Sequence, residues 1–427
     1  MIKQLIFALV LALTIGVFFW TMKRIFAYFK FTQSFPISDW GERIQLTLKV
    51  AIGQTKIFRF PFAGTLHAFV LWGFIVILFG SLEMMIDGLF GFERSLSFLG
   101  GFYDILMAFG DVFAFLIAII IMIFIARRLF FGVQRFEGIE MKHISHYDAI
   151  IALFIIFFLM ISLLGMNTFY LQLHPTDYHG SYPISSYFAS MITDTSNAHF
   201  WHEFFWWFHI LGIFIFANIL PYSKHFHVFM SVPSVVVSKL EPLGYIDNMP
   251  QITKEVKMMM DPNAAFDESQ EEEMVRFGAK DVEDLTWKNY LNSLACTECG
   301  RCTSVCPANQ TGKLLSPRKI IMNVRARMKE KGPGMIREGL SYDDGKALLR
   351  DFISEEELWA CTLCNACAQE CPININHPSI ILDLRRYLVM EEAAAPSELN
   401  TVFSNIENNG APWQYAQDDR MNWAEGL

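Results

Sequence analysis

The chain has 427 residues, of which 53% are hydrophobic, 15% aromatic and only 18% charged, a balance that excludes an ordinary soluble two-domain protein. Basic residues exceed acidic ones by one over residues 1–228, whereas acidic residues exceed basic ones by ten over residues 229–427. The absence of a basic surplus, of heptads and of periodic glycine excludes nucleic-acid-binding, coiled-coil and collagen-like classes. The first half therefore has the composition of a membrane domain, and the second that of a soluble domain.

Five stretches are apolar over about 20 residues, which is long enough to cross a bilayer core as helices. They cover residues 2–22, 62–86, 104–126, 147–170 and 203–223. The alternative interpretation of the first stretch as a cleaved signal peptide is disfavoured, because the stretch is too long and no small-residue cleavage site follows it. The sequence predicts an all-α fold, with a five-helix transmembrane bundle in residues 1–230 and a helical soluble domain after it.

Basic residues in the connections between the five stretches indicate how the bundle is oriented. The first and third connections hold most of them, namely Lys23, Arg24, Lys30, Arg43, Lys49, Lys56 and Arg59, then Arg127, Arg128, Arg135 and Lys142. Residues 167–208 contain no lysine or arginine. We therefore expect a multi-pass protein of the cytoplasmic (inner) membrane, with its N-terminus outside and its second half in the cytoplasm.

The second half divides into three parts. Residues 231–284 form a linker, which is amphipathic at first and has an acidic run over residues 261–273 that is typical of a solvated segment. Residues 285–395 form a cysteine-bearing domain, and residues 396–427 form a polar tail that carries Trp413 and Trp423. Two aromatic side chains in a polar tail indicate either docking to a partner or a helix packed back on the domain.

All eight cysteines lie in two runs of identical spacing, C-x2-C-x2-C-x3-C followed by proline. In two-cluster ferredoxins with this run, the fourth cysteine binds the cluster of the other run. The predicted ligands of one [4Fe-4S] cluster are Cys296, Cys299, Cys302 and Cys371, and those of the second are Cys361, Cys364, Cys367 and Cys306. Two structural zinc sites are disfavoured, because zinc sites use two separated pairs of ligands.

The 54 residues between the two runs are too many for a compact hairpin and read as helices. One predicted helix covers residues 317–331 and places Ile320, Ile321, Val324 and Met328 on one face. The spacing therefore favours a helical dicluster domain. Positive charges near a cluster raise its reduction potential. The candidates for such charges are Lys313, Arg318 and Arg301. Alternatively, these three residues are ordinary surface charges.

The runs CTECGRCTSVCPANQTGKLLSPRKI and CTLCNACAQECPININHPSI resemble the dicluster ferredoxin module of the iron-sulfur subunits of heterodisulfide reductase and of glycolate and glycerol-3-phosphate oxidases. The resemblance covers about residues 288–427. In those families a tail like NNGAPWQYAQDDRMNWAEGL leads into cysteine-rich catalytic domains. All eight cysteines of this chain are already assigned, so the resemblance implies that a separate cytoplasmic cysteine-rich redox protein supplies that chemistry.

Histidines within or beside apolar spans are functional candidates, because an unpaired imidazole is costly there. His209 and His227 are 18 residues apart, about 27 Å along a helix, so His227 and His67 of the second span lie at the same depth. Two imidazoles on facing helices can hold one haem iron, with His225 as a substitute for His227. Alternatively, His225 and His227 contact lipid headgroups and His209 is hydrogen-bonded inside the bundle.

The segment FHILGIFIFANILPYSKHFHVFMSVP resembles the last span of the cytochrome b subunit of respiratory nitrate reductase, a five-span protein that binds two b haems. The resemblance implies that His67 and His227 hold an inner haem b and that His209 is one ligand of an outer haem. The partner of His209 is expected about three turns beyond His67, where this sequence has Ile77. The outer haem therefore lacks a second ligand at the expected position, unless His199 or His202 replaces that partner.

Ionisable residues also gather at the outer ends of the spans. A quinone that exchanges protons with the outer side needs carboxylate or imidazole groups there. We expect this quinone site among Glu83, Asp111, His202 and Glu203. Asp87 and Asp104 read as solvated loop charges, and Trp201, Trp206 and Trp207 as an interfacial aromatic belt.

These expectations combine into a membrane-bound electron-transfer subunit of an oxidoreductase complex. It would pass electrons between the quinone pool, haem b, two [4Fe-4S] clusters and the cytoplasmic partner. The alternative is a membrane-tethered dicluster ferredoxin without haem, acting as a redox sensor or scaffold. An ion pump is disfavoured, because the ionisable groups cluster at one face. No catalytic nucleophile, nucleotide loop or nucleic-acid partner is indicated by the sequence.

Overall fold

The computed structural model describes the whole chain except residues 139, 142, 261–275, 415 and 427. Helices and turns make up the described residues, which contain no β-strand and only two isolated bridges, Gln33 with Thr286 and Leu349 with Ile353. The predicted all-α fold is confirmed. The predicted acidic run at residues 261–273 falls outside the described residues.

In the part of the chain that the structure describes, five helices are long and apolar enough to cross a membrane. They are α1 (Ile2–Ala27), α3 (Pro61–Phe90), α4 (Gly101–Phe130), α5 (His143–Leu173) and α7 (Ala198–Ile219). At about 1.5 Å per residue, each reaches or exceeds the thickness of a bilayer core. The five predicted spans are therefore confirmed, and the helices extend beyond most of the predicted ends.

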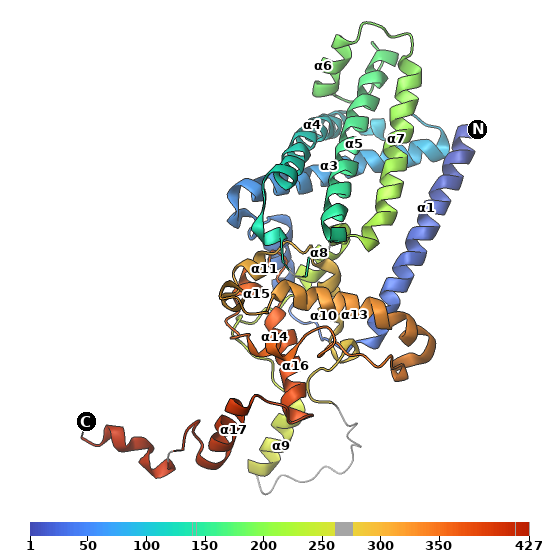
Figure 1. Ribbon diagram of the computed structural model, residues 1–427. Coiled ribbons are helices and arrows are strands. Elements are labelled where there is room, and N and C mark those ends of the chain that lie inside the picture. The colour runs from blue at the N-terminus through green and yellow to red at the C-terminus, as the bar shows by residue number, and fades with distance from the viewer. Residues whose placement is uncertain (139, 142, 261–275, 415, 427) are drawn as a thin grey trace.

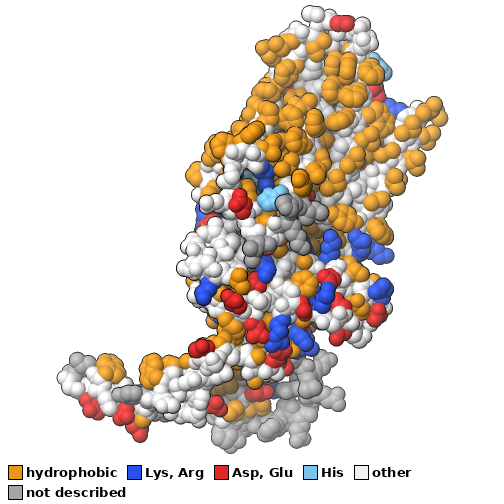
Figure 2. Space-filling model, viewed as in Figure 1, with side chains coloured by type: hydrophobic (Ala, Val, Ile, Leu, Met, Phe, Trp, Pro, Cys, Tyr) orange, Lys and Arg blue, Asp and Glu red, His pale blue; other side chains and the backbone are white. Residues whose placement is uncertain are grey.

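The bundle is built around α5 and α7, which run side by side in Figure 1. Glycines bring these two helices together, since an added Cβ would lie 2.8 Å from Phe205 at Gly165 and 2.8 Å from Leu159 at Gly212. The short helix α6 (Pro183–Met191) lies at the end of the bundle farthest from the cysteine-bearing domain, while α1 stands at its margin. Hydrophobic side chains cover the visible face of the bundle, and charged ones gather over the second half (Figure 2).

The cysteine-bearing domain consists of short helices around one longer helix, α13 (Pro317–Glu338). The others are α10 (Trp287–Ala295), α11 (Arg301–Ser304), α12 (Pro307–Gln310), α14 (Glu355–Trp359), α15 (Ala366–Glu370) and α16 (His377–Met390). The Ser316 hydroxyl caps α13 by accepting from the Lys319 amide. The predicted apolar face of this helix (Ile320, Ile321, Val324 and Met328) is fully buried, so the helix prediction is confirmed.

The polar tail contains α17 (Ser397–Asn409) and a 3-10 segment, Gln417–Ala424. Both extend away from the rest of the chain in Figure 1. Trp413 is 62% exposed and Trp423 is 73% exposed. The tail is therefore not packed back on the domain, and docking to a partner stays a prediction.

The two halves of the chain share one hydrophobic core. Ile25 and Tyr28, at the end of α1, belong to the same buried cluster as the apolar residues of the cysteine-bearing domain. The connection after α1 pairs with that domain through two backbone hydrogen bonds, Gln33 N to Leu285 O at 2.9 Å and Trp287 N to Gln33 O at 3.0 Å. The short helices α2 (Trp40–Thr47) and α8 (His227–Val236) pack together, and the predicted domain boundary at residue 230 falls inside α8. The bundle and the domain are thus held as one unit.

A buried ion pair also joins the halves. Arg318 of α13 is 1% exposed, donates from Nε to Glu140 at 2.8 Å, and also donates to the carbonyls of Arg135 and Glu137 at 2.7 Å each. We expect Arg318→Ala to lower the free energy of unfolding by about 3–5 kcal/mol, because it leaves the Glu140 carboxylate buried without its partner. Thermal unfolding of the purified protein would measure this. Lys313→Ala, at an exposed lysine of the same domain, is the control, and equal stability of the two variants would contradict the prediction.

Candidate functional site

The first cysteine run sits between α10 and α12. The helix α10 ends at Ala295, Glu298 and Gly300 then adopt positive φ angles of 57° and 74°, and α11 carries Cys302. Cys302 lies within electrostatic range of Cys296, Cys299 and Cys371. The structure therefore brings together the four residues of the first predicted set, which we call the first cysteine group.

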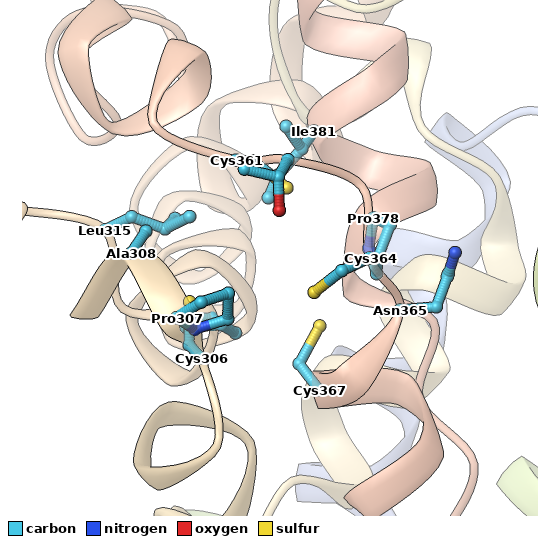
Figure 3. Close-up of a pocket in the computed structure, with 12 residues that line it drawn as sticks. Cys306, Pro307, Ala308, Leu315, Cys361, Cys364, Asn365, Cys367, Pro378 and Ile381 are labelled. Atoms are coloured by element: carbon cyan, nitrogen blue, oxygen red, sulfur yellow. The ribbon is translucent and has the colours of Figure 1, made fainter. Parts of the chain in front are cut away.

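The second set meets in a pocket that is shown in Figure 3. Its lining includes Cys306, Cys361, Cys364 and Cys367 together with apolar residues such as Leu315 and Ile381. The sulfur atoms of Cys364 and Cys367 point toward each other across this space. We call these four residues the second cysteine group. It is the more accessible of the two, because Cys364 is exposed.

The two runs repeat one local geometry. Leu363 and Asn365 of the second run have positive φ angles of 54° and 60°, like Glu298 and Gly300 of the first. A short helix begins after the second left-handed residue of each run, α11 after Gly300 and α15 after Asn365. These two helices pack against each other. Each run then turns at a cysteine that precedes a proline. Because α11 and α15 pack together, the last cysteine of each run lies on the side of the first three cysteines of the other run.

The thiols are suited to binding a cluster rather than to catalysis. Burial raises the pKa of Cys296 to about 12 and that of Cys371 to about 11, so neither would be a reactive thiolate by itself. All eight cysteines are free of disulfides. Among the described residues, no three His, Cys, Asp or Glu side chains converge on a point that could hold a single metal ion. The four cysteines of the second group line one pocket instead, as expected for the ligands of a four-iron cluster.

Positive side chains lie close to the first cysteine group. Arg301 and Arg135 both lie within electrostatic range of Cys299, and Arg301 also of Cys371. Of the predicted cations, only Arg301 occupies this position. Arg318 is engaged with Glu140, and Lys313 is exposed on the domain surface. Sequence reasoning missed Lys56, which donates to the Cys371 carbonyl at 3.2 Å.

His67 and His227 lie near each other at the end of the bundle that faces the cysteine-bearing domain. His67 is within electrostatic range of both His227 and Arg301, and its Nδ1 is buried without a hydrogen-bond partner. His227 begins α8, and its Nδ1 lies 3.2 Å from the Lys224 carbonyl. That contact leaves Nε2 available as a metal ligand. His225 is held in the same way, since its Nδ1 lies 3.1 Å from the Ser223 hydroxyl, and it stays the possible substitute for His227.

His209 is fully buried in the middle of α7. Its Nδ1 lies 2.9 Å from the Leu159 carbonyl and 3.0 Å from the Ser162 hydroxyl, while Nε2 is buried without a partner. Ile77, at the position expected for a second ligand, packs in the apolar cluster that contains Leu159. His202 is on the same helix as His209, about 10.5 Å away along its axis, and therefore does not face it.

The predicted quinone residues lie around the far end of the bundle. Glu83 is buried, accepts from the Leu96 amide at 2.9 Å and the Tyr103 hydroxyl at 3.0 Å, and lies 3.9 Å from Arg94. Asp111 accepts from the amides of Ile184 and Ser185 at 2.8 and 2.9 Å, so it anchors the first turn of α6. His202 lies beside Tyr170, whereas Glu203 forms an ion pair with Lys3 of α1 at 2.6 Å. The four residues therefore do not form one cluster.

Two polar residues that sequence reasoning missed connect Glu83 with Asp111. Arg94 donates to Asn167 at 3.0 Å, and Asn167 donates to Asp111 at 3.4 Å. Both Arg94 and Asn167 are buried and line a pocket between α3, α4 and α5. Gly80 and Gly110 belong to the same lining, and an added Cβ would meet nothing within 4 Å at either. The signal in the sequence was Arg94 itself, the one basic residue between Arg59 and Arg127.

Comparison with known proteins identifies the cysteine-bearing region. A family described as "4Fe-4S dicluster domain" matches residues 292–375. The chain is 30% identical over 455 residues to the "probable iron-sulfur-binding oxidoreductase FadF" of Bacillus subtilis, across 99% of this chain and 61% of that protein. It is 29% identical over 414 residues to the "EtfAB:quinone oxidoreductase" of Syntrophomonas wolfei, across 90% of this chain and 54% of that protein.

A shorter match joins the cysteine-bearing region to methanogen enzymes. The chain is 34% identical over 107 residues to one subunit of the ferredoxin/F(420)H(2)-dependent CoB-CoM heterodisulfide reductase of Methanosarcina acetivorans, across 25% of this chain and 52% of that subunit. No solved structure matches the chain. The chain spans little more than half the length of the two long relatives. It contains a dicluster 4Fe-4S domain and is homologous to iron-sulfur oxidoreductases and to heterodisulfide reductase subunits.

Proposed function

We propose that the chain is the membrane subunit of an oxidoreductase complex and carries electrons between the quinone pool and a cytoplasmic redox partner. The observation that supports this most is the position of Arg301. Its side chain lies within electrostatic range of Cys299 and of Cys371, and it also acts on His67 in the bundle. The candidate haem ligands and the first cysteine group are therefore neighbours.

The residues around these sites would hold the cofactors in place. His67 and His227 are the proposed ligands of a haem b, with the Lys224 carbonyl fixing the His227 ring. The first and second cysteine groups are the proposed ligands of two [4Fe-4S] clusters. When bound, these groups supply one-electron redox chemistry, and the protein fixes their spacing and excludes water. His209, whose Nε2 is buried without a hydrogen-bond partner, is the proposed ligand of a second haem.

The relatives support both ends of this electron path. One is named an EtfAB:quinone oxidoreductase, and its similarity to this chain includes the membrane half. The subunits of heterodisulfide reductase match only the cysteine-bearing region. We infer a quinone as the membrane substrate and, as the cytoplasmic partner, a cysteine-rich redox protein of the heterodisulfide reductase kind. A protein like EtfAB is the second candidate partner.

The inferred location is the cytoplasmic membrane, with the cysteine-bearing domain in the cytoplasm and the N-terminus outside. The distribution of charge supports this, because the basic connections of residues 23–59 and 127–138 lie at the end of the bundle that contacts this domain. The far end carries few basic residues, and the two that occur there, Lys3 and Arg94, are paired with carboxylates.

The pocket beside Arg94 and Asn167 is the proposed place for the quinone ring. Glu83, with Tyr103 and Arg94 on its carboxylate, is the proposed proton acceptor. Asp111 lines this pocket, whereas His202 lies outside the lining, beside Tyr170. Glu203 stays a weaker proposal, since it pairs with Lys3.

We expect Glu83→Gln to slow the reduction of haem by a menaquinol analogue by about 10²-fold, because a group that accepts the quinol proton is lost. Stopped-flow absorption at the α band would measure the rate, and the spectrum after dithionite should not change. Glu93→Gln is the matched control, since Glu93 is an exposed carboxylate at the same end of the bundle. Equal rates in the two variants would contradict the role of Glu83.

A further inference from the structure

The membrane half contributes a side chain to the first cysteine group. Lys56 lies in the connection between α2 and α3, and its Nζ donates to the carbonyl of Cys371 at 3.2 Å and to that of Ala368 at 3.5 Å. Lys56 also acts electrostatically on the Cys371 thiol. A cation made by the first half of the sequence is therefore held beside a cysteine of the second half.

The position of Lys56 is fixed from both sides. Arg301, one residue before Cys302, donates to the backbone carbonyl of Lys56 at 2.9 Å and to that of Ile57 at 3.3 Å. Arg59 of the same connection donates to the Gln369 carbonyl at 2.9 Å and lies 3.1 Å from Glu370. The connection is thus bound to α11 and α15 at once, and the ammonium group is held at the carbonyls of Ala368 and Cys371.

The second cysteine group has no comparable contact in the described part of the membrane half. The cation that acts on Cys361 is Arg385 of α16, and this residue belongs to the cysteine-bearing domain itself. Arg385 donates to the carbonyls of Leu358 and Cys361. The first group thus has neighbouring cations from both halves, Lys56 and Arg301, whereas the described cation beside Cys361 comes from the cysteine-bearing domain.

We propose that Lys56 sets the reduction potential of the cluster held by the first cysteine group and keeps it higher than it would otherwise be. This inference rests on the proposed function, in which that group binds a [4Fe-4S] cluster. Reduction adds one electron and hence one negative charge to the cluster. A fixed ammonium group in a buried, weakly screened setting stabilises the reduced form more than the oxidised form. The potential then depends on contact between the two halves.

The test is a redox titration of the full-length protein, followed by electron paramagnetic resonance of the reduced clusters. Cys364→Ser identifies the signal of the second group. Lys56→Gln keeps an amide donor for the two carbonyls but removes the charge, and Lys56→Arg keeps the charge. Lys49→Gln is the matched control, because it removes an exposed cation from the same connection.

We expect Lys56→Gln to lower the midpoint potential of the first cluster and to leave that of the second unchanged. Lys56→Arg and Lys49→Gln should titrate close to the wild type. An unchanged potential in Lys56→Gln, with about eight irons per chain retained, would overturn the inference and leave the proposed function intact. Far fewer than eight irons in the wild-type protein would instead refute the cluster assignment on which the inference rests.

Discussion

Replacing either His67 or His227 with alanine is expected to abolish the spectrum of a low-spin haem b. Each side chain is a proposed axial ligand, and a single remaining imidazole cannot hold the iron in a six-coordinate, low-spin state. The neighbouring imidazole of His225, whose Nδ1 lies 3.1 Å from the Ser223 hydroxyl, is the possible substitute for His227, so the double variant His225→Ala/His227→Ala completes the test. Absorption spectra of the dithionite-reduced protein would measure the loss of the sharp α band.

The matched control is His225→Ala, two residues from His227 and outside the proposed ligand pair. It should retain the α band. An unchanged α band in both His67→Ala and His227→Ala would refute the proposal that these residues hold an inner haem. If the wild-type protein has no α band after dithionite, the chain is a tethered dicluster ferredoxin, and its buried histidines need another explanation.

The second large effect concerns the fourth cysteine of each run. We expect Cys371→Ser and Cys299→Ser to lose the same cluster signal, although these residues lie in different runs. Cys306→Ser and Cys361→Ser should lose the other signal. The reason is that Cys371 meets the first cysteine group, whereas Cys306 lines the pocket of Cys361, Cys364 and Cys367. Each variant should retain about four of the eight irons that the two clusters contribute per chain.

Paramagnetic resonance of the reduced variants, together with iron and sulfide analysis, would measure this exchange. Ser304→Ala is the control, because Ser304 lies in the first run but its hydroxyl only donates to the Arg301 carbonyl. If Cys371→Ser loses the signal that Cys361→Ser loses, each run binds its own cluster and the proposed exchange is wrong.

Much of the fold could be predicted from local pattern. The five apolar stretches are each longer than a bilayer core requires, so they left few alternatives. The helix over residues 317–331 could be predicted from the spacing of Ile320, Val324 and Met328. Its extension to Glu338 could not, because the added turns contain Gly332, Pro333 and Gly334. There, packing against Tyr28 and Tyr342 overrides weak helix propensity.

The candidate site could be predicted where spacing carries the chemistry, as in the cysteine runs. It could not be predicted where a side chain meets a distant part of the chain. In the sequence, Lys56 is one of several basic residues that indicate the orientation of the bundle. In the structure, it donates to the Cys371 carbonyl, 315 positions away. Arg318 read as a charge near a cluster, but its partner is Glu140, 178 positions earlier. Asp111 read as a quinone residue, and its backbone partners in α6 show an anchoring role as well.

The pairing of the connection after α1 with the cysteine-bearing domain has a consequence for biogenesis. The Trp287 indole donates to the Phe35 carbonyl at 3.2 Å, across 252 positions of sequence. A ribosome that adds about 5–20 residues per second needs roughly 10–50 s to make that stretch. During this time the aromatic side chains of Tyr28, Phe29 and Phe31 have no partner from the later half. This segment is the first part of the chain to be synthesised outside the membrane, and the domain that covers it is synthesised last. The nascent chain therefore depends on chaperones or on rapid synthesis to keep the segment from aggregating in the meantime.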